Sequence, residues 1–205
     1  MCSAKGLTRM LPEESGQNVD QDINTFKEKL ASHSALDIVR STIISGECSC
    51  LEHDKYYDLR NVVSGHFDVH PNEVILVGSA KLGFSIAPDK EFRPFGDNSD
   101  LDIAIISPRL FDAFWVQLFD YSRSGALWDK LDDFEQFLFR GWIRPDLFPR
   151  EIRLASDWWD FFLGLTRSGQ YRYQVRGALY RSWHCIECYH VERVEEMQLH
   201  TGGNR

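Results

Sequence analysis

The sequence lacks a long hydrophobic segment. Among its 205 residues there is no run of eighteen or more apolar residues, and about that many are needed for a helix to cross a bilayer. The first twelve residues contain Lys5 and Arg9 but no apolar stretch of the kind that a secretory signal requires. We therefore expect no membrane insertion, no secretion and a cytoplasmic location.

Basic charge is also scarce. The chain has 23 Lys and Arg residues against 31 Asp and Glu residues, which gives a formal net charge of −8. Proteins that bind duplex nucleic acid without sequence preference do so mainly by neutralising its phosphates with basic side chains. The composition therefore excludes general duplex nucleic-acid binding, but it leaves room for a local basic pocket that binds one nucleotide.

Cysteine is present in an odd number, five, so a framework of paired disulfides is not expected and the thiols should be reduced. The cysteine and histidine residues available for a zinc site are Cys48, Cys50, His184, Cys185, Cys188 and His190. A structural zinc site needs four ligands held by turns, whereas residues 183–197 have the pattern of a helix. The pattern favours an ordinary helix over a zinc site.

The apolar fraction of 43% is large enough for a substantial core, and a chain of this length needs no metal or disulfide to fold. We expect a flexible arm over residues 1–18, a single domain over 19–200 and a flexible tail over 201–205. Apolar spacing predicts helices over 19–30, 36–43, 56–67, 108–118, 127–139, 156–165 and 183–197, and strands over 73–77, 101–106 and 173–179. This order predicts an α+β fold with a small mixed sheet flanked by helices.

Two aspartates carry the clearest chemical signal. Asp100 and Asp102 are two positions apart at the start of a predicted strand, so their carboxylates project from the same face. Adjacent carboxylates repel each other unless a cation lies between them, and paired oxygen ligands suit Mg²⁺ or Mn²⁺. The pair therefore predicts a divalent metal site with Asp100 and Asp102 as ligands.

A second signal comes from Gly78 and Ser79, which end the preceding predicted strand and open a short helix. Glycine lets the backbone approach a ligand closely, and free N–H groups at a helix start bind phosphate. Lys81 follows within the same segment and is a further candidate phosphate ligand. The end of the first strand thus presents hydrogen-bond donors for phosphate, and the start of the next strand presents metal ligands. This combination suits a metal-bound nucleoside triphosphate.

The runs GSAKLGF (78–84) and SDLD (99–102) resemble the DNA polymerase β-type nucleotidyltransferase superfamily. They are closest to its small bacterial branch akin to the cyclic-oligonucleotide synthases of antiphage defence. The run GALYRS (177–182) is similar to the last core strand and helix of that branch. The resemblance implies a polymerase β-like nucleotidyltransferase fold over residues 19–200, with catalytic Asp100 and Asp102 and with Gly78, Ser79 and Lys81 on the nucleotide.

The activity implied by the resemblance is transfer of a nucleoside monophosphate from a nucleoside triphosphate, ATP or dATP, to a hydroxyl group. The acceptor is a second nucleotide or a tyrosine of the protein itself, for which Tyr189 is the candidate. The product would be a nucleotide oligomer or signal in antiphage defence, read by a downstream effector protein. The alternatives are a nucleotide-binding module with weakened catalysis and an antitoxin-like regulator of a partner protein.

The sequence departs from the family in two places. Residues 80–99 separate Ser79 from Asp100, a longer segment than is usual in the family, which fits an inserted loop over 89–98. The third carboxylate that the family places on a later strand is missing from the predicted strand 173–179. Glu151, Asp157 and Asp160 are other candidates, although we expect the two aspartates to suffice.

Overall fold

The computed structural model describes residues 12–90, 92–144, 147–149 and 151–202, with side chains from residue 19 onward. The fold is α+β, as the sequence predicts. A mixed sheet of four strands consists of β1 (Val74–Val77), β2 (Asp100–Ile106), β4 (Gln174–Tyr180) and β3 (Trp142–Ile143), in that order. β2 and β4 are parallel, and the other two neighbouring pairs are antiparallel.

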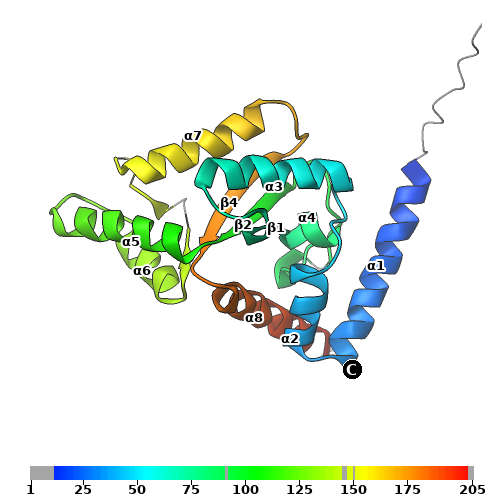
Figure 1. Cartoon of the computed structure of the whole chain (residues 1–205). Coiled ribbons are helices and arrows are strands. Elements are labelled where there is room, and N and C mark those ends of the chain that lie inside the picture. The colour runs from blue at the N-terminus through cyan, green and yellow to red at the C-terminus, as the bar shows by residue number, and fades with distance from the viewer. Residues whose placement is uncertain (1–11, 91, 145–146, 150, 203–205) are drawn as a thin grey trace, which may run out of the picture.

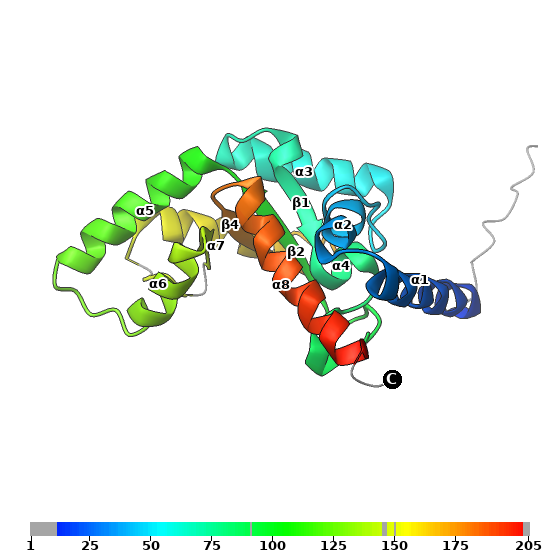
Figure 2. The ribbon, with the colours of Figure 1, turned by 90° about the horizontal axis from the view of Figure 1, so that it is seen from below.

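Helices cover both faces of the sheet (Figures 1 and 2). The first face packs against α3 (His53–Phe67), α5 (Pro108–Arg123), α6 (Leu131–Phe139) and α7 (Arg153–Arg167). The second face packs against α1 (Pro12–Ser32), α2 (Ala35–Ile38), η1 (Val39–Ile44) and α8 (Trp183–Gly202). The short segments are α4 (Gly78–Leu82), directly after β1, and the turns η2 (Pro71–Glu73) and η3 (Pro88–Lys90). Among the described helices, none is long and apolar enough to cross a membrane.

The central strand β2 separates two hydrophobic clusters. Leu101, Ile103 and Ile105 lie in the cluster on the first face, and Ala104 and Ile106 lie in the cluster on the second face. Successive side chains of a strand point to opposite faces, so the two site aspartates share the second face with Ala104. The alternation of apolar residues thus determines which helices surround the acids.

Several element boundaries differ from the predicted ones. α1 begins at Pro12, within the arm expected for residues 1–18, and residues 1–11 lie outside the described part of the chain. α8 continues to Gly202, two residues into the expected tail 201–205. α6 begins at Leu131 instead of residue 127, and α7 at Arg153 instead of residue 156. These differences leave the identity of the predicted elements unchanged.

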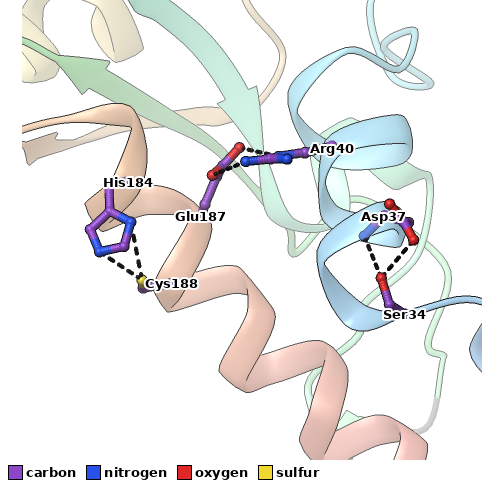
Figure 3. A network of polar contacts seen from close by, with 6 residues as sticks. All are labelled: Ser34, Asp37, Arg40, His184, Glu187 and Cys188. Carbon is purple, nitrogen blue, oxygen red and sulfur yellow. Dashed lines mark hydrogen bonds and ion pairs between the residues drawn. The ribbon is translucent and has the colours of Figure 1, made fainter.

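Polar contacts fasten α8 across the second face. Arg40 of η1 donates from Nε to Glu187 Oε1 (2.7 Å) and from Nη2 to Oε2 (3.0 Å), as Figure 3 shows. Near the end of α8, Gln198 Nε2 donates to the carbonyl oxygens of Leu30 (2.9 Å) and His33 (3.0 Å). The two-pronged contact between Arg40 and Glu187 fixes orientation as well as distance. Together with the contacts of Gln198, it holds α8 near both ends.

Candidate functional site

The turn from β1 into α4 brings the backbone beside Asp102. Gly78 has φ +64°, a left-handed conformation that favours glycine. A Cβ atom on Gly78 would lie 3.3 Å from Asp102 Oδ2, and the preceding residue Val77 pairs with Asp102 in the β1–β2 register. The structure therefore brings the predicted phosphate-binding turn and the predicted metal ligand together.

Asp100 and Asp102 differ in their surroundings. Asp100 forms an ion pair with Arg176 of β4, with 3.3 Å between Oδ2 and Nε. The side chain of Asp102 is accessible to solvent from within a cavity. Its pKa is raised to about 6, first by partial removal from bulk water between the surrounding segments and second by the charge of Asp100. The positive charges of Arg176 and Lys90 offset part of this rise. A further cation beside Asp102 would stabilise its charged form.

The cavity around Asp102 has a volume of about 440 Å³. Four parts of the chain line it: the Gly78–Ser79 turn, the segment 85–90 that leads into the expected inserted loop 89–98, Asp102 of β2, and α8. Ligand sites in proteins commonly have volumes of about 300–1,000 Å³, so the space suits one small ligand. The lining includes the cations Lys90 and Arg193 together with Asp102, a combination that suits an anionic ligand with a bound metal.

His190 of α8 also lines the cavity, a position that the sequence did not predict. Its side chain is 4% exposed, and its Nε2 atom is buried without a hydrogen-bond partner. Burial, together with the charge of Arg193, lowers the pKa of His190 to about 4, so the ring is neutral at pH 7. The available signal was the spacing of four between Ile186, His190 and Val194, which places the histidine on the buried face of the helix.

Lys81 does not join the other predicted ligands. Its side chain is buried, its Nζ donates to the carbonyl oxygen of Gly46, and it lies 5.7 Å from the centre of the Tyr56 ring. It is not among the residues that line the cavity. Lys81 therefore does not reach this cavity, and the basic residues that line it are Lys90 and Arg193.

No carboxylate of β4 stands beside the aspartates. The parallel register pairs Asp100 with Gln174 and Asp102 with Arg176. A guanidinium group thus occupies the place where the family resemblance led us to look for a third acid.

The other candidates for a third acid lie elsewhere. Glu151 contacts the Tyr121 hydroxyl of α5 (3.5 Å), and Asp157 contacts His66 Nε2 of α3 (3.2 Å). Asp160 is exposed on α7. Since α3, α5 and α7 cover the first face of the sheet, these acids are separated from Asp102 by the sheet.

The donor set is consistent with a hard divalent cation that shares its coordination with water and phosphate. Within the described residues, no group of three or more His, Cys, Asp and Glu side chains is placed to hold a metal. Asp100 and Asp102 offer two carboxylates, and Mg²⁺ commonly takes one or two carboxylates and completes its shell with water and substrate phosphates. Two cysteines instead have one such neighbour each. Cys188 Sγ lies 3.5 Å from His184 Nε2, a contact drawn in Figure 3, and Cys48 Sγ lies 3.9 Å from Cys50 Sγ.

Comparisons of the chain with protein-family models, with curated proteins and with solved structures find no significant match. The functional argument therefore depends on the geometry and chemistry of the site.

Proposed function

We propose that the protein is a metal-dependent nucleotidyltransferase with a polymerase β-like fold. The observation that carries the proposal is the approach of the Gly78 backbone to Asp102 within one cavity of about 440 Å³. Phosphate-binding backbone and metal-binding carboxylate have to be neighbours in such an enzyme, because the metal bridges the phosphates of the substrate. The antiparallel pairing of β1 with β2 produces this neighbourhood.

Six residues have a role in this proposal, and all of them line the cavity except Asp100, which lies two positions before Asp102 on β2. Asp100 and Asp102 hold Mg²⁺ or Mn²⁺, which when bound supplies positive charge to the leaving pyrophosphate. Gly78 and Ser79 donate hydrogen bonds to the triphosphate of ATP or dATP. Lys90 of η3 and Arg193 of α8 add positive charge to the lining of the cavity.

The acceptor hydroxyl is proposed to come from a second nucleotide or from Tyr189, which lines the same cavity as Asp102. Arg193 lies close to the Tyr189 ring, with 5.6 Å between the guanidinium carbon and the ring centre. The product is then a nucleotide oligomer or a protein-linked nucleotide, a signal for a downstream effector in antiphage defence.

The proposal is tested with α-phosphate-labelled ATP and dATP in the presence of Mg²⁺. We expect a labelled oligomer or labelled protein from the wild type and none from the double variant Asp100→Ala, Asp102→Ala. Asp20→Ala, Asp22→Ala is the matched control, because it removes two exposed carboxylates at the same spacing from α1. Circular dichroism verifies folding, and undiminished product from the Asp100, Asp102 variant refutes the assigned site.

A second candidate function is nucleotide binding without turnover. It is favoured by Arg176, which pairs with Asp100 (3.3 Å) and stands where a third acid would be expected. In the same assay, Mg²⁺-dependent binding of ATP without a labelled product identifies such a module.

A further inference from the structure

Two thiols lie side by side in the loop between η1 and α3. The Sγ atoms of Cys48 and Cys50 are 3.9 Å apart, and both residues are partly buried. Backbone contacts fix this loop against α4: Ser49 N–H donates to the Lys81 carbonyl (3.1 Å). Ser49 also packs closely against Gly83, the C-cap of α4: a Cβ atom on Gly83 would lie 3.2 Å from Ser49 Cβ. The thiol pair is therefore held in place before any reaction.

The surroundings of Cys48 favour a thiolate. The Cys50 thiol donates to Cys48, the backbone N–H groups of Leu51 and Cys50 donate to it as well, and Lys81 contributes positive charge. The opposing contact is the Ala80 carbonyl oxygen, 3.7 Å from Cys48 Sγ. Because the donors and the cation outweigh desolvation, the pKa of Cys48 is lowered to about 6, whereas the pKa of Cys50 is raised by its hydrogen bond to Cys48 and by burial.

The charged and titratable groups around the pair come from three segments. Lys81 is contributed by α4, and Tyr56 and Arg60 by α3, while Glu47 belongs to the loop itself. Reactive cysteines in proteins occupy such electropositive, partly exposed places, and redox-sensing ones have a second cysteine nearby that resolves the oxidised form. Cys48 has the environment of the attacking thiol, and Cys50 has the position of the resolving thiol.

We propose that Cys48 and Cys50 form a redox-active dithiol, which a small disulfide such as glutathione disulfide converts into an intramolecular disulfide. In the first step the Cys48 thiolate attacks one sulfur of glutathione disulfide, the bond between its sulfurs breaks, and one glutathione thiolate leaves. In the second step Cys50 loses its proton to solvent and attacks Cys48 Sγ, and the second glutathione thiolate leaves. The protein loses two electrons, and glutathione disulfide is reduced to two glutathione molecules. The two sulfurs approach from 3.9 Å to about 2.05 Å.

The first test measures alkylation by iodoacetamide at pH 7, followed by peptide mass spectrometry. We expect Cys48 to react at least several-fold faster than Cys188, which is exposed on α8. Cys50→Ala should slow the labelling of Cys48, because it removes the thiol donor. Cys50→Ser is the matched control, because its hydroxyl still donates. Equal labelling of Cys48 in the two variants, or faster labelling of Cys188 in the wild type, overturns the proposal.

The second test equilibrates the full-length protein in buffers with increasing ratios of glutathione disulfide to glutathione. Tryptic residues 41–55 contain both Cys48 and Cys50 and no other cysteine, so the disulfide appears as a loss of two hydrogen atoms from this peptide. We expect the wild type to form it reversibly and Cys50→Ser to stop at a glutathione adduct on Cys48. The control Cys185→Ser, Cys188→Ser should oxidise like the wild type. Absence of the mass loss from the wild-type peptide at every ratio refutes the dithiol.

Discussion

His190 shows how burial determines the behaviour of one side chain near the site. Its pKa is lowered to about 4, so the folded protein binds this proton more weakly than the unfolded chain, whose histidines titrate near 6.5. Its contribution to stability is therefore fully present above pH 6.5 and is lost as the pH falls towards 4. Between pH 6.5 and pH 5 the free energy of unfolding falls by about 2 kcal/mol through His190, at about 1.4 kcal/mol per pH unit.

We expect His190→Leu to reduce this acid sensitivity. The melting temperature of the wild type should fall between pH 7.5 and pH 5 by about 4–8 °C more than that of the variant, at about 2–4 °C per kcal/mol. Thermal unfolding followed by circular dichroism measures the difference. His200→Leu, which removes an exposed histidine from the last turn of the same helix, should keep the wild-type dependence. Identical pH profiles for wild type and His190→Leu would contradict the prediction.

The missing third acid gives a prediction about catalysis. Glu151→Gln, Asp157→Asn and Asp160→Asn should each lower the rate of nucleotidyl transfer by less than 100-fold. These acids lie at the face of the sheet opposite Asp102, and general-base assistance is typically about 10²- to 10⁴-fold. Single-turnover rates measure the effect. A drop of 100-fold or more in one variant, with folding and ATP binding unchanged, would identify the acid that we expect to be absent.

The sequence allowed part of the arrangement of the candidate site to be predicted, for identifiable reasons. Asp102, Gly78 and Ser79 lie together because strand alternation and a glycine turn are local properties that a short motif encodes. Lys81 was misplaced because the side of α4 that faces the cavity depends on packing against Gly46 and Tyr56, which are distant in sequence.

At the scale of elements, α5 begins at Pro108, the first residue of the predicted helix 108–118. Pro108 occupies the first turn, and Leu110 N–H donates to the Ser107 hydroxyl (3.3 Å). β3 was missed, because it has only two residues and exists through its pairing with β4, Trp142 with Tyr180. The start of α5 is therefore determined by local contacts, whereas the short strand depends on a partner far along the chain.

The cap supports a prediction on stability. Ser107→Ala should lower the free energy of unfolding by about 1 kcal/mol, within the usual range of about 0.5–2, because it removes the acceptor for Leu110 N–H. The backbone contact from Ser107 N–H to the Tyr180 carbonyl (3.0 Å) remains in the variant. Urea unfolding measures the change, with Ser156→Ala on an exposed face of α7 as control. Equal stability of Ser107→Ala and wild type would contradict the role of the cap.

At the scale of the whole molecule, a bound metal and nucleotide should stabilise the folded state together. Mg²⁺ with ATP is expected to raise the melting temperature more than either alone, because each offsets the charge of the other within the cavity. At a free ligand concentration of 100 times the dissociation constant, the free energy of unfolding increases by about 2.7 kcal/mol. This corresponds to an increase in melting temperature of about 5–10 °C at this chain length. Differential scanning fluorimetry measures the shift. Equal stabilisation by Zn²⁺ without nucleotide, or an unchanged shift in Asp100→Ala, Asp102→Ala, would contradict the prediction.

The class of fold was predictable, and the order of the strands was not. Apolar periodicity identified β1, β2 and β4 and the helices around them, which is enough for an α+β sheet flanked by helices. The pairing of Asp102 with Arg176 joins β2 and β4, which are separated by residues 107–173. A short sequence pattern therefore cannot predict which residues pair across the two strands.

The parallel pairing of β2 with β4 also constrains how the protein is made. During synthesis β2 leaves the ribosome with β1 available on one side, but its other edge has no partner until 67 more residues (107–173) have been translated. An unpaired strand edge invites pairing with other chains, and domains with such non-local pairing fold slowly. We expect the like charges of Asp100 and Asp102 at the start of β2 to disfavour such pairing until β4 has been translated.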